Sequence, residues 1–171
     1  MKSSKRNILI YVLLGIAIGI FLRVFIFNVE KVAGTSMEPS LKEGDTVIIN
    51  KLAYGIANPV TGKLMVQWAK PKTNDIIVYY MNNKLVVKRC VATENMPLDF
   101  SKLSGYSFSV GGTENPLEIP LTEQQYQRLK YDTSVPEGTV LAIGDNYEES
   151  VDSRTYGFIE VDCILGKVIW H

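Results

Sequence analysis

The sequence predicts a mainly β protein with one apolar helix at its N-terminus and one short helix in its second half. Three observations support this prediction: an uncharged run from Ile8 to Leu22, several short β-branched runs separated by turn residues, and one helix-capping signal at Thr122–Gln125. The chain has 171 residues, of which 46% are hydrophobic. Beyond its N-terminal segment, it is therefore long enough to form one domain with a buried core.

Composition excludes several classes of function. Lys+Arg and Asp+Glu number 18 each, so the formal net charge of +0 gives no electrostatic basis for binding nucleic acid. The one histidine, His171, ends the chain, which argues against a Ser-His-Asp triad, a Cys-His protease and most zinc sites. We expect no metal and no cofactor. Cys90 and Cys163 show no metal-binding spacing, and either a disulfide or two buried thiols would fit them.

The N-terminal segment has the features of a membrane anchor. The uncharged run Ile8–Leu22 continues past Arg23, and about 20 apolar residues cross a hydrocarbon core of roughly 30 Å. We predict a transmembrane anchor over residues 8–27, with residues 1–7 in the cytoplasm and the rest outside, because basic residues precede the span: Lys2, Lys5 and Arg6. A cleaved signal peptide is the alternative, but the stretch after Phe27 lacks a good small-x-small cleavage site.

The next segments read as strands and turns. Gly44-Asp45 signals a turn, and the β-branched run after it predicts a strand near residues 46–50. Residues 53–74 predict a long loop or a ragged hairpin, in which Trp68 belongs either to the core or to an aromatic surface at the lipid headgroups. Asn82-Asn83 predicts a two-residue turn between strands over residues 75–81 and 84–92.

The second half begins with a segment that looks like an insertion. Glycines and prolines divide residues 93–139 into short strands, and the capping box Thr122–Gln125 predicts a helix to about Tyr131. Further strands are expected over residues 139–143, 157–159 and 164–170. The predicted β-rich core therefore comprises residues 28–92 and 140–171, with residues 93–139 as an accessory insertion.

Ser36 is a candidate nucleophile on the loop Gly34–Leu41. It lies about nine residues beyond Phe27, at most roughly 30 Å of extended chain, so its hydroxyl would stay near the outer membrane surface. Most serines in such a loop are ordinary turn or cap residues. Because no histidine is suitably placed, a nucleophilic Ser36 would need another base, and the usual substitute is a lysine made neutral by burial.

Lys88 is the candidate for that base. It stands beside Arg89 inside an apolar predicted strand, where neighbouring residues face opposite sides, so one of the two should point inward. Lysine suits a dry pocket better than arginine, because burial readily shifts the pKa of lysine whereas arginine stays charged. The alternative is a bulge or an edge strand with both charges solvated.

A polar loop runs from Gly144 to Gly157 between two predicted strands. Its acidic spacing does not fit an EF-hand calcium loop. A surface turn held by an Asp152–Arg154 pair is the simpler interpretation, but it does not explain why so many polar groups lie between apolar strands.

Four blocks of this sequence, in order, resemble those of bacterial type I signal peptidase, the membrane-bound Ser-Lys protease. They follow the predicted anchor and span most of the chain outside the insertion. The blocks are Ser36–Leu41, Gly44–Val47 with Lys51, Lys88-Arg89, and Gly144–Asn146 with Ser150, Asp152–Arg154 and Gly157.

The resemblance implies a role for each matched residue. Ser36 would attack the scissile carbonyl, and a neutral Lys88 would accept its proton and later activate water. Ser150 would hydrogen bond to Lys88, and Asp152 with Arg154 would keep that loop rigid. A Gly34 replaces the serine that helps to form the oxyanion hole in some members, so the Ser36 N–H is the donor that remains.

The resemblance also implies a fold, a substrate and a location. The fold would be a coiled antiparallel β-sheet catalytic core, with one N-terminal transmembrane helix and one short soluble helix. Signal peptides of exported preproteins would bind as an added strand beside Val32–Thr35 and Leu85–Lys88. We expect Val32, Met37 and Val86 to contact the substrate. Membrane lipid is the other expected partner, and the expected location is the plasma membrane.

Two further departures from the family pattern and two alternatives remain. Asn95–Asp99 stands where the family commonly has Pro-Gly-Asp, and Tyr147 replaces an arginine often found after Gly-Asp-Asn. A membrane-anchored β-domain that binds peptides without cleaving them would keep the same fold. A penicillin-binding-type enzyme requires Ser-x-x-Lys, and no serine here has a lysine three residues later.

Overall fold

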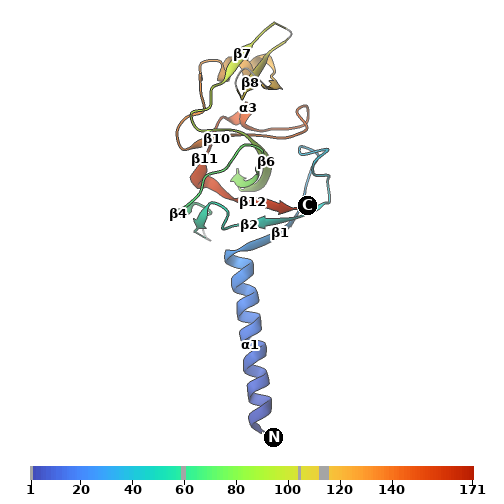
Figure 1. The fold of residues 1–171 in the computed structure, drawn as a ribbon. Coiled ribbons are helices and arrows are strands. Elements are labelled where there is room, and N and C mark those ends of the chain that lie inside the picture. Colours follow the sequence, from blue (N-terminus) through green and yellow to red (C-terminus); the bar gives the residue numbers. More distant parts are fainter. Residues whose placement is uncertain (1, 59–60, 104, 112–115) are drawn as a thin grey trace.

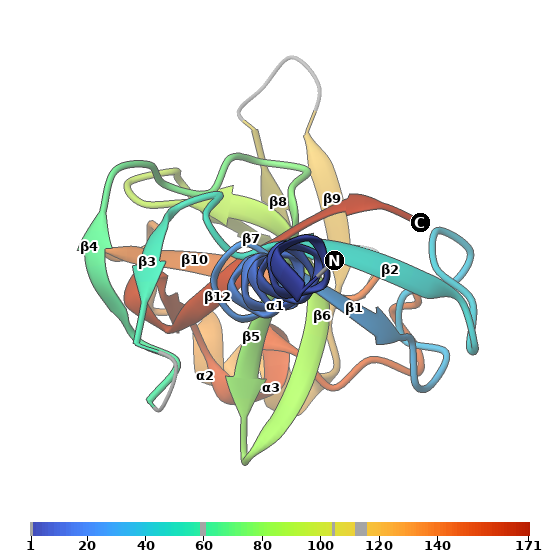
Figure 2. The same ribbon diagram turned by 90° about the horizontal axis from the view of Figure 1, so that it is seen from below.

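The computed structural model describes residues 2–58, 61–103, 105–111 and 116–171. A long N-terminal helix, α1 (Lys2–Phe25), projects from one end of a β-rich domain (Figure 1). Figure 2 shows the molecule along α1, with the strands of the β-rich domain on all sides of the helix axis. In the described structure strands far outnumber helices and all strand pairs are antiparallel, which confirms the predicted mainly β class.

Helix α1 differs in its limits from the predicted anchor over residues 8–27. It ends at Phe25, and Phe27 begins the first strand, β1 (Phe27–Lys31). Large apolar side chains from Ile8 to Leu22 are exposed along α1. In the part of the chain that the structure describes, no helix combines the length and the apolarity needed to cross a membrane.

The main sheet has seven strands in the order β1-β2-β12-β5-β6-β10-β11. Every neighbouring pair is antiparallel. The strands after β1 are β2 (Thr46–Asn50), β5 (Ile76–Met81), β6 (Lys84–Thr93), β10 (Thr139–Ile143), β11 (Ile159–Glu160) and β12 (Ile164–Trp170). The sheet is therefore not a simple sequential meander, because β12 lies between β2 and β5.

The first half of the chain contains two hairpins, and a local sequence signal accounts for the one between β5 and β6. Asn82 and Asn83 have φ angles of 50° and 60°, a conformation that asparagine tolerates, and they join β5 to β6 as predicted. Strands β3 (Gly55–Ala57) and β4 (Leu64–Gln67) form a separate hairpin. Trp68 follows this hairpin with 54% of its surface exposed, so it does not belong to the core.

Residues within the predicted insertion form a second sheet. Strands β7 (Asp99–Ser101), β8 (Ser107–Val110) and β9 (Leu117–Pro120) pair with one another, and helix α2 (Glu123–Leu129) follows them. The predicted capping box is present, since the Thr122 side chain accepts from the Gln125 N–H and the Gln125 side chain accepts from the Thr122 N–H. The helix ends two residues before the expected Tyr131.

The prediction of only one short helix is wrong. A second one, α3 (Ser153–Tyr156), begins inside the polar loop. The Asp152 side chain accepts a hydrogen bond from the Arg154 N–H and caps this helix, which turn-forming residues had hidden in the sequence. A 3₁₀ turn, η1 (Val161–Cys163), also precedes β12.

The core lies on both sides of the main sheet. One cluster, which includes Met37, Leu41 and Val78, packs the serine loop onto the sheet. Another joins the main sheet to the accessory sheet through Leu141 and Phe108. Both cysteines are free thiols, Cys90 buried and Cys163 half-buried, so the alternative of a disulfide is wrong.

Candidate active site

Ser36 and Lys88 meet across the fold. Lys88 is buried and Arg89 pairs with Asp145, so the alternative in which both charges are solvated is wrong. The alternation of the strand turns Lys88 inward, where it is only 4% exposed, and Arg89 to the opposite face. The Lys88 Nζ lies 2.6 Å from the Ser36 Oγ and donates a hydrogen bond to it.

The surroundings of Lys88 favour its neutral form. Burial lowers the pKa of Lys88, because the ammonium loses hydration. The charges of Asp152 and Asp145 act in the opposite direction, and the charge of Arg154 lowers this pKa further. The balance leaves the pKa of Lys88 below the usual value, which is the condition for a lysine to act as a general base.

The serine loop is fixed by short-range turns and by a long-range contact. Within the loop, the Glu38 N–H donates to the Thr35 carbonyl at 3.0 Å, and the Leu41 N–H donates to the Met37 carbonyl at 2.9 Å. From the polar loop, the Asn146 N–H donates to the Ser36 carbonyl at 3.1 Å. The Asn146 side-chain amide also donates to the Thr35 carbonyl at 3.3 Å. The polar loop therefore holds the backbone on both sides of the candidate nucleophile.

Arg89 forms a second connection that the sequence did not reveal. Its guanidinium binds both carboxylate oxygens of Asp145, at 2.8 and 2.6 Å, and also donates to the Ser40 Oγ at 3.1 Å. Burial alone would raise the pKa of Asp145, but hydrogen bonds from Arg89 and Ser40 bring it below its usual range. Arg89 thus joins the strand of Lys88 to the serine loop and to the Gly144–Asn146 turn.

Asp152 and Arg154 form a buried ion pair, so the interpretation of the polar loop as a surface turn is wrong. The pair is 0% and 2% exposed, with Nη2 at 2.8 Å from the Asp152 Oδ2. The Asp152 Oδ2 also accepts from the Gly144 N–H at 3.1 Å. The Arg154 Nη2 donates to the carbonyls of Tyr147 at 2.8 Å and Ser150 at 3.3 Å. Both carboxylate oxygens of Asp152 accept hydrogen bonds from groups of this loop, which explains why the loop contains so many polar groups.

Ser150 differs from the expectation that it binds Lys88. It is 7% exposed, and its Oγ has no hydrogen-bond partner within the described residues, while Lys88 donates to Ser36 instead. Ser150 still lies against the Gly144 backbone, since a Cβ placed on Gly144 would approach the Ser150 Oγ to 2.3 Å.

A cleft of about 310 Å³ opens at the pair Ser36 and Lys88. All three residues expected to contact the substrate line it: Val32, Met37 and Val86. Gly34 is not among the lining residues; it is exposed with a φ of +86°, a conformation that favours glycine. The cleft thus brings the two predicted catalytic residues and the three predicted contact residues together.

Two strand segments with open edges border the cleft. Strand β1 ends the sheet order and pairs with β2 alone. Strand β10 pairs only with residues 89–93 of β6, so in the described structure the segment Lys84–Lys88 has a strand neighbour on one side only, β5. An extended peptide could add to either edge by main-chain hydrogen bonds.

One group of side chains in the described structure has the geometry to hold a metal ion. It consists of Glu160, Asp162 and Cys163, and none of these residues lines the cleft. Lys63 already pairs with Glu160 at 3.6 Å and with Asp162 at 3.4 Å.

Comparison with known proteins identifies the family to which this chain belongs. The family described as "Signal peptidase, peptidase S26" matches residues 5–97 and 105–171. Signal peptidase I of Bacillus caldolyticus is 33% identical over 160 residues, which cover 86% of this chain and 80% of that protein. Signal peptidase IB of Staphylococcus aureus is 28% identical over 178 residues, which cover 98% of this chain and 89% of that protein.

Two further similarities are more distant. Thylakoidal processing peptidase 1 of Arabidopsis thaliana is 26% identical over 157 residues, covering 91% of this chain and 45% of that protein. A crystal structure of a signal peptidase I from Enterococcus faecalis matches 58% of this chain and 97% of that chain, with 22% identity and a TM-score of 0.41.

Proposed function

This chain belongs to the signal peptidases of the S26 family, and we propose that it removes signal peptides from exported preproteins with Ser36 as nucleophile and Lys88 as general base. As a member of this family it is a serine endopeptidase. The distance of 2.6 Å between Ser36 Oγ and Lys88 Nζ carries the proposal, because it is the hydrogen-bond distance that direct proton transfer requires.

The proposed reaction begins with neutral Lys88. Its amine accepts the hydroxyl proton as the Ser36 oxygen attacks the scissile carbonyl, and the resulting ammonium then protonates the leaving amine as the acyl-enzyme forms. The neutral amine next takes a proton from water, which attacks the acyl-enzyme, and the ammonium returns that proton to the departing Ser36 oxygen. Each cycle therefore ends with Ser36 protonated and Lys88 neutral, as it began.

The proposed oxyanion donor is the Ser36 N–H. Gly34 offers no hydroxyl at the position where some family members have a serine, and losing one donor can cost about 2.7–4 kcal/mol in transition-state stabilisation. A water molecule or a second main-chain N–H is the proposed replacement for that hydroxyl.

The buried polar loop is the proposed support for the base. Asp152 and Arg154 satisfy each other and several backbone groups, so the loop has little freedom to move. Ser150 is the proposed orienting group for the Lys88 amine, since its buried hydroxyl is uncommitted in this structure. Such support matters because a displacement of about 1 Å at a reacting group can cost on the order of a hundredfold in rate.

The proposed substrate is an extended signal peptide that lies in the cleft between β1 and the first half of β6. Its main chain would add to the open strand edges. Small side chains at positions −1 and −3 would enter the shallow apolar regions formed by Val32, Met37 and Val86, where larger side chains would be excluded.

The proposed location is the outer face of the cytoplasmic membrane. Apolar side chains of α1 from Ile8 to Leu22 are exposed, and the helix projects away from the β-rich domain (Figure 1), so lipid is the environment that would cover them. In this arrangement residues 1–7 are cytoplasmic, residues 8–27 form the anchor, and the remaining chain lies outside: the core, residues 28–92 and 140–171, with the accessory insertion, residues 93–139. The cleft would then be held near the membrane surface, where a signal peptide emerges.

Peptide cleavage tests the proposal. The full chain, purified in detergent, should cut a synthetic peptide after an Ala-x-Ala sequence, and Ser36→Ala should abolish this cleavage while leaving the melting temperature unchanged. Ser134→Ala, which removes an exposed hydroxyl elsewhere, should cut normally. Wild-type protein that binds the peptide without cutting it would instead support a non-catalytic β-domain.

A further inference from the structure

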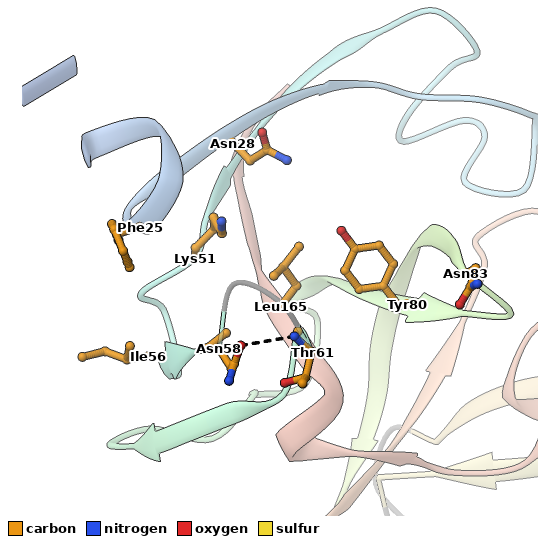
Figure 3. A pocket seen from close by; sticks show the side chains of 11 residues that line it. Phe25, Asn28, Lys51, Ile56, Asn58, Thr61, Tyr80, Asn83 and Leu165 are labelled. Carbon is orange, nitrogen blue, oxygen red and sulfur yellow. Dashed lines mark hydrogen bonds between the residues drawn. The ribbon is translucent and has the colours of Figure 1, made fainter. Parts of the chain in front are cut away.

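A pocket of about 340 Å³ lies at the junction of α1 and the β-rich domain (Figure 3). Phe25, the last residue of α1, lines it, and so does Lys51, which directly follows β2. The Lys51 N–H donates to the carbonyl of Ile26, the residue after the helix, at 2.8 Å, so the backbone of this lysine is hydrogen bonded next to the helix end. The pocket is separate from the Ser36–Lys88 cleft, because the two share no lining residue.

The chemistry of the lining favours an anion. Lys51 is the one cationic side chain among the described residues that line the pocket, and none of those residues is Asp or Glu. Several neutral polar groups accompany it: Asn28, Asn58, Thr61, Tyr80 and Asn83. Partial burial lowers the pKa of Lys51, because its ammonium loses hydration.

Neighbouring groups hold two of these polar side chains, Asn58 and Tyr80, in position. The Asn58 Oδ1 accepts from the Thr61 N–H at 3.2 Å, which orients the amide in the turn after β3 (Figure 3). Gly62 lies against the Tyr80 ring, since a Cβ there would approach the ring to 3.2 Å. Figure 3 shows the Tyr80 hydroxyl directed toward the side of the pocket where Asn28 and Lys51 lie.

The position of the pocket identifies the source of the anion. Exposed apolar side chains cover α1 as far as Leu22, and two further exposed apolar residues, Phe25 and Ile56, line the pocket. When α1 lies in a bilayer, this pocket is at the depth of the headgroups, where phosphate is the abundant anion. The apolar part of the lining can contact the first carbons of an acyl chain.

We propose that this pocket binds the phosphate group of a membrane phospholipid, with Lys51 as the charged ligand and the Tyr80 hydroxyl as a neutral one. The inference depends on the membrane location proposed above. A lipid held at this point would fix the β-rich domain against the membrane and so set the height of the cleft above the surface.

Native mass spectrometry of the full chain in a neutral detergent tests this inference. Three probes separate the sources of binding: phosphatidylglycerol, a diacylglycerol with the same chains but no phosphate, and inorganic phosphate. We expect the wild type to retain phosphatidylglycerol and neither of the other two. Lys51→Gln should retain about fivefold less lipid, Lys51→Arg should retain it, and Tyr80→Phe should show a smaller loss.

Lys102→Gln is the matched control, because it removes the same charge just after β7, at the end of the domain opposite α1 (Figure 1). It should retain lipid as the wild type does, and melting curves should show that every variant is folded. Equal retention by Lys51→Gln and wild type would overturn the proposal. Retention of diacylglycerol or of inorganic phosphate at the level of phosphatidylglycerol would also overturn it.

The proposed peptidase activity is measured on the same preparations with a soluble peptide. Wild-type protein that cuts the peptide but retains no phospholipid would refute the lipid site and leave the peptidase function intact. Protein that retains the lipid but cuts no peptide would refute the function and leave the lipid site standing.

Discussion

The backbone of Gly144 lies against the carbonyl oxygen of Ser36, so close that a Cβ on Gly144 would approach this oxygen to 2.4 Å. The same Cβ would meet the Ser150 Oγ at 2.3 Å. Real Cβ atoms essentially never lie so close to other atoms, so Ser36 or Ser150 would have to shift. Glycine at position 144 is therefore required by close packing.

Gly144→Ala should lower the cleavage rate by about a hundredfold, because the displaced Ser36 would no longer meet Lys88 at a productive distance. It should also lower the melting temperature through overpacking. Gly15→Ala makes the same change in α1, where the added Cβ meets nothing within 4 Å, and should leave the rate unchanged. Steady-state cleavage of a peptide measures both variants. Wild-type turnover by Gly144→Ala would contradict the observed packing.

The dependence of cleavage on pH should report Lys88. Its pKa is lowered in the folded protein, and the neutral amine is the active form, so the rate should be low at acidic pH and rise through the folded-state pKa. Lys88→Arg keeps the charge but has no accessible neutral form, so it should be as inactive as Lys88→Ala. Cleavage by Lys88→Arg at the wild-type rate would show that Lys88 is not the base.

Stability should change with pH for the same reason. Because the folded pKa of Lys88 is below the unfolded value, the unfolded chain binds more protons between these two values, and stability rises with pH across that window. This contribution is complete above the unfolded pKa and is lost as pH falls through the folded one. Lys88→Met should remove it. Melting curves of the two proteins across alkaline pH measure the difference, and identical pH profiles would show that the pKa of Lys88 is not lowered.

Asp152→Asn should strongly destabilise the protein. It breaks a buried ion pair and leaves Arg154 without its counter-charge, a change that typically costs about 3–5 kcal/mol. Asp162→Asn removes a carboxylate from the exposed contact with Lys63 and should change stability much less. Denaturant unfolding measures the loss of unfolding free energy in each variant. Similar losses in the two would mean that the Asp152–Arg154 pair is solvated.

The same variant should also shift the pH profile of cleavage. The charge of Asp152 raises the pKa of Lys88, so its removal should move the acidic limb of the rate profile to lower pH. A purely structural role for Asp152 would lower the rate without moving the limb. Rate profiles measured at a temperature where the variant remains folded distinguish the two.

Protease accessibility should reveal the orientation of the protein in the membrane. The basic N-terminal flank places residues 1–7 in the cytoplasm, so protease added to intact cells stripped of their outer layers should digest the β-rich domain. A cytoplasmic protein should be digested only after lysis, which controls for leakage. Protection of the domain until lysis would reverse the proposed orientation.

Local sequence was sufficient for most elements of the fold. The Asn82-Asn83 turn, the Thr122–Gln125 capping box and most β-branched strands depend on residues close in the chain, and the structure has them. The strand expected over residues 157–159 is instead the two-residue β11, Ile159–Glu160. Strand alternation likewise predicted that Lys88 and Arg89 face opposite sides. The hidden helix α3 was missed, because its cap and its buried ion pair lie among residues that also favour turns.

The sequence by itself determined which groups were available for chemistry: a serine on a loop after an apolar segment, a lysine inside an apolar strand, and no histidine near either. Only the tertiary structure decided that Ser36 and Lys88 meet across 52 positions, that Arg89 binds Asp145, and that Lys51 lines a pocket at the end of α1. These contacts depend on the order of strands in the sheet, where β12 lies between β2 and β5. Strand order is set by the packing of the whole core, and the local propensities of single segments do not encode it.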